Sequence, residues 1–233
     1  MLEGLPLSVV LLFIATVVLT AWLFLDAMRS RAMNLLLVIW LAIQGLLAYK
    51  GFYTDTSGMP PRFIWATGPA ALFILIIFIS KKGRQFIDGL DLRSLTLLSV
   101  VRIPVEIVLC LLFLYRAIPE LMTFEGRNFD ILAGLTAPII YFTCFKARQV
   151  TKHSLLLIWN ILSLGLLLNI VIHAILSAPF RFQQFGFDQP NKAVLYFPFI
   201  WLPCFIVMAV LFSHLASIRN LLLHKKGSDI FVD

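Results

Sequence analysis

Two oppositely charged residues lie four positions apart inside an apolar stretch of this 233-residue chain: Arg102 and Glu106, with Pro104 between them. Residues at this spacing share one face of a helix and can pair. A charge near the centre of a bilayer costs roughly 2.5–3.5 kcal/mol, so such residues usually pair, line a wet cavity or mark a functional site. The proline removes a backbone donor and tends to kink the helix beside the charges. The pattern predicts a polar binding or gating centre, and the alternative is a structural ion pair that fixes helix packing.

Five further polar residues interrupt apolar stretches. Asn169 and His173 share one helix face, while Gln44, Asp130 and Tyr196 lie in three other stretches. From their expected depths, they would border one outward-facing polar cavity together with the charged pair. The alternative for isolated polar residues is a hydrogen bond between neighbouring helices, at roughly 0.6 kcal/mol each. Depth along the chain does not establish whether they converge laterally.

The segment before Asp130 is the densest polar string on the expected outer side. Asn128 is predicted to be the N-cap of the following helix, and Asp130 in the first turn suits the helix dipole. Capping leaves Glu120, Glu125 and Arg127 unexplained. These three are predicted to lie at the rim of the cavity.

Several chemistries are disfavoured. The histidines at positions 153, 173, 214 and 224 are too scattered for a metal or haem site, and no cofactor is predicted. No phosphate-binding loop, nucleophile elbow or His-Glu-x-x-His motif is present. The cysteines Cys110, Cys144 and Cys204 fall in apolar stretches and are expected to be buried small hydrophobes.

Composition identifies the class of protein. Hydrophobic residues make up 61% of the chain, charged residues only 13%, and the mean hydropathy is +0.95. A soluble domain of this length would carry far more charge. Runs of about 18 or more apolar residues are long enough to cross a ~30 Å hydrocarbon core. The prediction is an all-α integral membrane protein, one transmembrane domain over residues 1–233, whose partner is the lipid bilayer.

Seven apolar runs are separated by short charged loops, which predicts a bundle of seven transmembrane helices. The expected spans are residues 6–25, 33–49, 63–80, 95–115, 129–145, 154–176 and 193–215.

The basic residues give the bundle a direction. Loops one, three and five and the C-terminal tail carry twelve of them, against six in the other loops. The twelve are Arg29, Arg31, Lys81, Lys82, Arg84, Arg93, Lys146, Arg148, Lys152, Arg219, Lys225 and Lys226. Basic loops stay in the cytoplasm, so the N-terminus is expected outside and the C-terminus inside, most simply in the cell (inner) membrane. Since the net charge of +7 lies in these short loops, no nucleic-acid binding is predicted.

A weak internal similarity suggests a duplication. Leu35–Trp40 resembles Leu155–Trp159, and Phe63–Trp65 before Pro69 resembles Phe199–Trp201 before Pro203. Two triplets of helices running in the same direction, with the fourth span between them, would give a 3+1+3 build of a kind known in transporters.

The leading functional hypothesis is non-enzymatic: binding or translocation of a small solute in the outward-facing cavity, with Glu106 and Arg102 at its centre. The first alternative is a membrane enzyme acting on a lipid or isoprenoid, with Glu106 as general acid or base. The second is a structural subunit of a membrane complex. The sequence identifies neither the ligand nor the oligomeric state, and association of like copies stays open.

Overall fold

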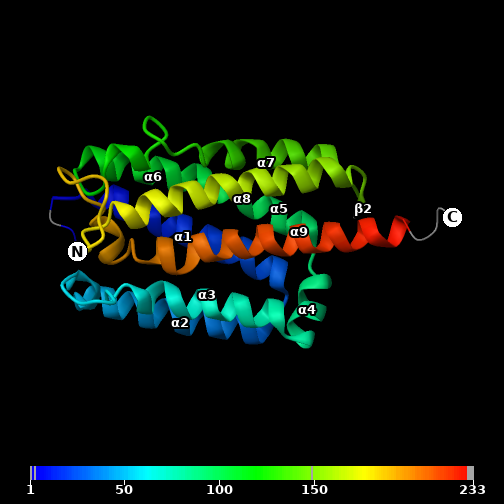
Figure 1. Ribbon diagram of the computed structural model, residues 1–233, viewed down its shortest axis with the longest axis horizontal. Helices are drawn as coiled ribbons and strands as arrows, with labels where there is room; N and C mark the ends of the chain where they lie inside the picture. Colours follow the sequence, from blue (N-terminus) through cyan, green and yellow to red (C-terminus); the bar gives the residue numbers. More distant parts are fainter. Residues whose placement is uncertain (1, 3, 148, 230–233) are drawn as a thin grey trace.

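The fold is described from a computed structural model, which covers residues 2, 4–147 and 149–229, with side chains up to residue 223. Arg148 and the side chains of Lys225 and Lys226, which entered the charge count, lie outside this description. The described chain is a bundle of roughly aligned helices (Figure 1) with one small antiparallel ribbon, Phe145–Lys146 paired with Gln149–Val150. The all-α prediction is confirmed.

Five helices are long and apolar enough to cross a membrane. They are α1 (Leu7–Met28), α2 (Arg31–Tyr49), the continuous run Leu92–Leu114, α8 (His153–Leu176) and Leu202–Leu223 within the last helix. A bent pair, α3 (Ile64–Ile79) and α4 (Lys81–Asp88), counts as a sixth candidate, and α7 (Ile131–Cys144) is a shorter apolar helix. The chain is therefore a multi-pass membrane protein.

The run Leu92–Leu114 changes its winding beside Pro104. It consists of α5 (Leu92–Leu98), a 3₁₀ turn at Ser99–Val101 and α6 (Arg102–Leu114). Proline has no N–H to donate and its ring crowds the carbonyl four residues earlier, here that of Val100. The tighter turn at this point accommodates that loss and lets α6 begin at Arg102.

The corner between α3 and α4 turns the chain by 88°. Ser80 ends α3 and caps α4, with its Oγ accepting a hydrogen bond from the Gly83 amide at 3.1 Å. A Cβ at Gly83 would lie only 2.2 Å from the carbonyl oxygen of Ile77, so this corner requires glycine. Two residues of the last helix bind α4. Asn220 donates to the Ile87 carbonyl, and Arg219 donates to the Asp88 carboxylate.

The last helix begins later than the expected span 193–215. Residues 193–201 contain only a short 3₁₀ turn (Ala193–Leu195), and the helix starts with a wide turn, η5 (Leu202–Ile206), that continues into α9 (Val207–Asp229). Pro203 at its first turn explains the irregular start, because the proline cannot donate to the preceding carbonyls. The predicted boundaries of this span were therefore wrong at both ends.

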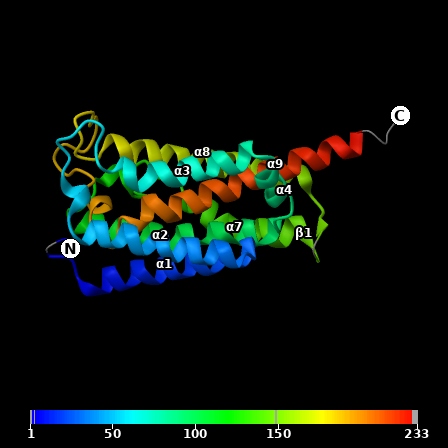
Figure 2. The same cartoon turned by 90° about the horizontal axis from the view of Figure 1, so that it is seen from below.

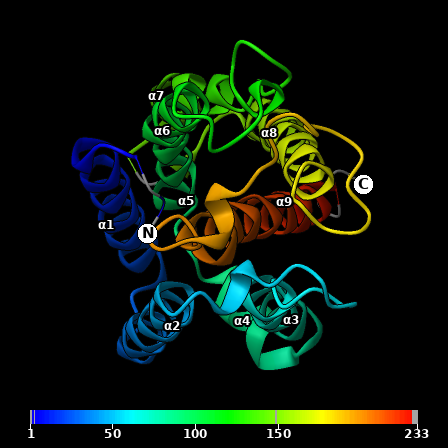
Figure 3. The same cartoon turned by 90° about the vertical axis from the view of Figure 1, so that its left-hand side faces the viewer.

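Helix α9 occupies the centre of the bundle. Seen end-on, it is ringed by the other helices, with α3 and α8 on either side of it (Figure 3). Of its most apolar 18 residues 56% are buried, against 22% of the corresponding 18 residues in the peripheral α2. Its inner face carries buried polar residues, among them His214 and Ser217. Polar side chains at the centre of a membrane bundle need partners, and these partners define the site.

Helix α7 packs along only the first half of the run Leu92–Leu114. Gly134 packs on Arg102 and Ile103, and Tyr141 binds Arg93, so α7 runs antiparallel to α5 and the start of α6. Helix α7 leads to β1 at the end of the bundle away from the N-terminus (Figure 2). The other half of α6 is covered by the irregular chain 115–130, with a 3₁₀ turn at Glu120–Met122 (η3). Asn128 of this segment bonds Glu106, eight residues before α6 ends, which at 1.5 Å per residue is about 12 Å below that end. Non-helical backbone at such depth is found where it is buried in protein or lines a cavity.

Candidate functional site

A buried polar cluster joins three helices and the segment before α7 at the middle of the bundle. It consists of Arg102, Glu106, Asn128, Asp130, Asn160 and His214, and we call it the Arg102 cluster. Each of these residues is at most 5% exposed. The chain positions them from α6, from the segment before α7, from α8 and from α9.

Arg102 is bonded to three elements at once. Its Nη1 donates to the Asp130 carboxylate at 2.8 Å and to the Ser163 carbonyl at 3.2 Å, and its Nη2 lies 2.8 Å from Nε2 of His214. The close approach of α7 at Gly134 brings Asp130 within reach: a Cβ on that glycine would lie 3.2 Å from Cβ of Arg102. The ion-pair partner of Arg102 is thus Asp130 and not Glu106, which corrects the predicted pairing.

The hydrogen bonds define the tautomer of His214. Asn160 donates from Nδ2 to the Leu156 carbonyl, so its Oδ1 faces Nδ1 of His214 at 2.8 Å as an acceptor. Nδ1 therefore carries the proton, and Nε2 offers its lone pair to the Arg102 guanidinium. The ring is neutral and contributes no charge to the cluster.

Glu106 belongs to a second branch of the cluster. Its Oε1 accepts a hydrogen bond of 2.5 Å from Nδ2 of Asn128, which also donates to the Met122 carbonyl at 3.0 Å. Oδ1 of Asn128 accepts from the Asp130 amide, so this residue shapes the turn before α7, whereas the helix cap is Asp130. Oε2 of Glu106 is buried and has no hydrogen-bond partner among the described residues.

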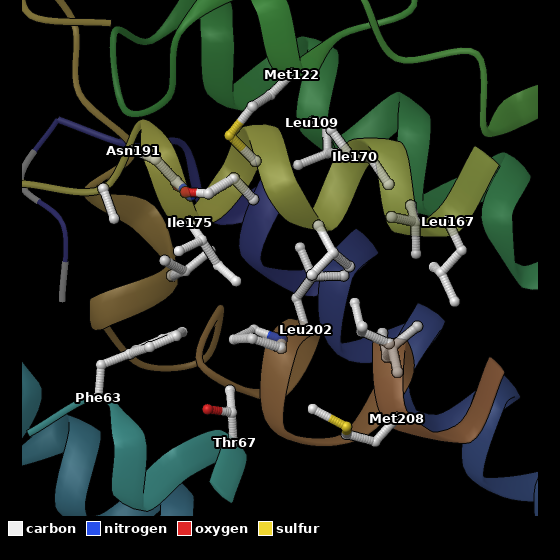
Figure 4. Close-up of a pocket in the computed structure, with 18 of the residues that line it drawn as sticks. Phe63, Thr67, Leu109, Met122, Leu167, Ile170, Ile175, Asn191, Leu202 and Met208 are labelled. Carbon is white, nitrogen blue, oxygen red and sulfur yellow. The ribbon is translucent and has the colours of Figure 1, made fainter. Parts of the chain in front are cut away.

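A cavity of about 440 Å³ lies against this cluster, between α3, α6, α8 and the start of the last helix. Phe63, just before α3, and Thr67 of α3 lie across it from Ile170 and Ile175 of α8, with Leu202 between them (Figure 4). Almost all of its wall is apolar. The polar residues among those lining it are Thr67, Arg102, Glu106, Asp130 and Asn191.

The cavity is partly open, and the exposed residues of its wall lie on α3 and α8. Ile64 of α3 and Ile175 of α8 line it and are 47% and 42% exposed, so they form its rim. The neighbouring outer surfaces are apolar, with Leu72 on α3 and Ile172 on α8 both more than half exposed. In a bilayer, such surfaces face the acyl chains.

The cavity takes in three of the seven residues singled out from the sequence: Arg102, Glu106 and Asp130. The other four are not among its lining residues. Gln44 bonds the Tyr53 hydroxyl and the Trp65 carbonyl, and Asn169 bonds the Arg127 carbonyl. His173 bonds the carbonyl of Asn169 and stacks on Phe185.

The last of these four, Tyr196, packs at the edge of the apolar core.

Outside the cavity, the hydroxyl of Tyr53 is fully buried. This burial, with a smaller contribution from Cys204, raises the pKa of Tyr53 to about 12. It therefore stays a hydrogen-bond donor to Gln44 at neutral pH.

Sequence reasoning missed Asn160, His214, Ser163 and Asn191 as members of the site. Asn160 is a polar residue in the middle of an apolar run, which is the signal that could have found it. His214 was taken to lie at the inner end of a span, because the expected helix stopped at residue 215. Within the described residues, no group of three or more His, Cys, Asp or Glu side chains is placed to hold a metal ion.

The fold and site define a multi-pass helical membrane protein with a buried charged cluster beside an apolar cavity. Residues 62–222 match the model of a family described as Domain of unknown function (DUF8737), and the chain belongs to this family. The matched region contains the Arg102 cluster and nearly the whole cavity wall, and excludes α1 and α2. No curated protein and no solved structure matches the chain.

Proposed function

We propose that this protein binds an amphipathic, lipid-like molecule in the cavity between α3 and α8. The observation that carries the proposal is the cavity's composition: an apolar chamber, rimmed by lipid-facing side chains, with ionisable residues confined to one part of its wall. Ligand sites commonly combine an apolar lining with a few polar groups that orient the ligand. The apolar part of the ligand would occupy the wall formed by α3 and α8, and its polar part would lie at the Arg102 cluster.

This proposal changes the expected ligand from a small solute in a polar cavity to an amphiphile in a mainly apolar one. Most of the wall would offer a small polar solute no hydrogen-bond partner. The cost of removing that solute from water would therefore be uncompensated. Entry from the bilayer, between α3 and α8, needs no aqueous path. The irregular chain 115–130 supports a binding role, because Met122 from this segment lines the cavity.

We test the proposal with a phospholipid that carries a photoreactive acyl chain, in nanodiscs containing the purified protein. Leu109 and Ile206 line the cavity and are each 3% exposed, so labelling of these residues requires a chain inside it. Ala71 lines the cavity at its exposed edge, so Ala71→Trp should block the opening and abolish this labelling. Ile76→Trp, on the outer face of the same helix, should leave it unchanged. Labels confined to outer residues such as Leu72 in the wild-type protein would refute the proposal.

For orientation in the membrane, we propose seven passes with the N-terminus outside in the cytoplasmic membrane. The charge distribution supports this direction. On this basis α7 and segment 115–130 make up the fifth pass together, since 14 helical residues reach only about 21 Å.

Thiol labelling tests the direction of the bundle. In a background without native cysteines, Gly58→Cys should react with an impermeant thiol reagent from outside and Gln85→Cys should not. The reverse pattern would invert the topology. The 3+1+3 duplication stays a prediction.

A lipid-modifying enzyme is the second candidate. It is favoured by one observation: Oε2 of Glu106 borders an apolar cavity without a hydrogen-bond partner among the described residues, as a general acid or base requires. An enzyme should convert a component of a membrane lipid extract, and Glu106→Gln should abolish the conversion. An unchanged lipid profile after prolonged incubation with folded protein would dismiss this candidate.

A further inference from the structure

Two hydrogen-bond acceptors on the cavity wall have no donor among the described residues. Oε2 of Glu106 and Oδ1 of Asn191 are both buried and have no partner among the described residues, and both side chains line the cavity. Each residue is 1% exposed, so bulk water does not supply the missing donor freely. An unsatisfied buried polar group costs about 1–3 kcal/mol, more if it is charged. Two such acceptors in one chamber indicate a ligand that donates.

The neighbouring donors are largely occupied. Asn191 uses Nδ2 on the Ala174 carbonyl, and Asn128 uses its Nδ2 on Glu106 and Met122. Arg102 uses three of its five N–H groups, and its Nε has no hydrogen-bond partner among the described residues. A ligand that only accepts hydrogen bonds could use the remaining N–H groups of Arg102, but it would leave Oε2 of Glu106 and Oδ1 of Asn191 without donors.

The charges of the cluster also favour a ligand that donates, and one that carries a positive charge. The cluster holds one guanidinium and two carboxyl groups, and the guanidinium is paired with Asp130 at 2.8 Å. His214 is neutral in the tautomer that its bonds require. One guanidinium cannot balance two ionised carboxyl groups, so a cationic ligand would supply the charge that ionised Glu106 lacks.

We infer that the polar end of the bound amphiphile is a protonated amine, which Glu106 recognises, with Asn191 a second acceptor on the same cavity wall. This inference rests on the proposed function and deepens it. An ammonium group offers three N–H donors and one positive charge, which suit the free acceptor and the ionised form of Glu106. A hydroxyl would satisfy one acceptor and leave the charge, and a carboxylate head would be repelled by Glu106.

The test compares three probes with the same chain: dodecylamine, dodecanol and dodecanoate. Near pH 7 the amine is protonated and the acid ionised, as their ordinary pKa values dictate. Binding to purified protein in nanodiscs is measured by calorimetry, with the signal from Ala71→Trp subtracted to remove partition into lipid. We expect dodecylamine to bind at least tenfold more tightly than dodecanol, and dodecanoate to bind most weakly.

Glu106→Gln provides the second arm. Glutamine can keep the bond accepted from Asn128, while an NH₂ donor replaces the free acceptor and the charge disappears. The amine affinity should fall about tenfold or more, and dodecanol should change less than threefold. Glu120→Gln removes the same charge from an exposed side chain outside the cavity wall and should have no effect.

The outcomes distinguish failure of the proposed function from failure of the amine assignment. If no probe shows binding that Ala71→Trp abolishes, the proposed function itself fails. If such binding exists but dodecanol or dodecanoate equals the amine, the cavity is an amphiphile site and the amine assignment is overturned. The wild-type series alone decides this point if Glu106→Gln does not fold. Full amine preference retained in a folded Glu106→Gln variant would also overturn the role of Glu106.

Discussion

The pairing of Arg102 with Asp130 makes a quantitative prediction about stability. The two side chains are 3% and 8% exposed, and Nη1 lies 2.8 Å from Oδ1. The chain also offers a matched surface pair, Arg219 with Asp88, at the same distance but with side chains 26% and 36% exposed. Arg→Gln and Asp→Asn, made singly and together at each pair, give two double-mutant cycles that differ mainly in burial.

Removing one member of a buried pair strands the other. We expect Arg102→Gln and Asp130→Asn each to lower the free energy of unfolding by about 3–5 kcal/mol. The double variant strands no charge of this pair, so the coupling energy should be about 2–3 kcal/mol. At the exposed pair, water screens the charges and the coupling should be about 1 kcal/mol or less. A third cycle, Arg102 with Glu106, should show weaker coupling than Arg102 with Asp130, because Glu106 bonds Asn128.

The measurement is unfolding in mixed micelles by titration with dodecyl sulfate, followed by intrinsic fluorescence and far-ultraviolet circular dichroism. Agreement of the two probes supports a two-state treatment. Equal coupling energies at the buried and exposed pairs would refute the reasoning, since burial would then have no effect. A larger coupling for Arg102 with Glu106 than with Asp130 would reject the assigned ion pair.

Three further predictions follow from single contacts. Gly83→Ala should destabilise the protein by about 1–3 kcal/mol in the same unfolding assay, because its Cβ would meet the Ile77 carbonyl at 2.2 Å; Gly89→Ala, whose nearest atom is at 3.6 Å, is the control, and an equal loss would contradict the tight corner. Nitrogen-15 NMR of labelled histidine should show His214 as the neutral tautomer protonated at Nδ1, and an Nε2-protonated ring would contradict its bonds to Asn160 and Arg102. Asn169→Ala should cost less than about 1 kcal/mol and leave dodecylamine binding unchanged, and a large loss of binding would place Asn169 in the site.

Much of the architecture was predictable, because apolar runs and their breaks are local properties of the sequence. The starts of α1, α3 and α8 lie within a residue or two of the expected spans. The last helix was misplaced for a physical reason. Its second half carries Ser213, His214, Ser217 and Asn220, which a hydropathy reading treats as the end of a span. In the bundle they are buried at the centre. Other helices supply partners for His214 and Asn220, and Ser213 donates to the Val210 carbonyl of its own helix.

The site was less predictable than the fold. A spacing of four between Arg102 and Glu106 suggested a pair within one helix, but the true partner of Arg102 comes from 28 residues away. Local spacing indicates which residues can meet, and tertiary packing decides which do. The close approach at Gly134 and the start of α7 at mid-depth bring Asp130 to Arg102, and neither is visible in hydropathy.

The start of α7 explains part of the cluster without any ligand. A helix that begins inside the bilayer region exposes unpaired N–H groups at a positive dipole end. Leu132 and Ala133 donate to the carbonyls of Phe129 and Asp130, and the Asp130 amide donates to Asn128. The Asp130 carboxylate then lies at the helix start, where Arg102 neutralises it.

Architecture therefore accounts for Arg102, Asp130 and Asn128, but it does not account for Glu106. A glutamine at that position could accept the same bond from Asn128, with no uncompensated carboxylate beside an apolar cavity. The second oxygen of Glu106 serves no described contact within the fold. A group that is costly to bury and unused by packing is best explained by what the cavity binds. This is why the amine assignment depends on Glu106, while the stability of the bundle depends on Arg102 and Asp130.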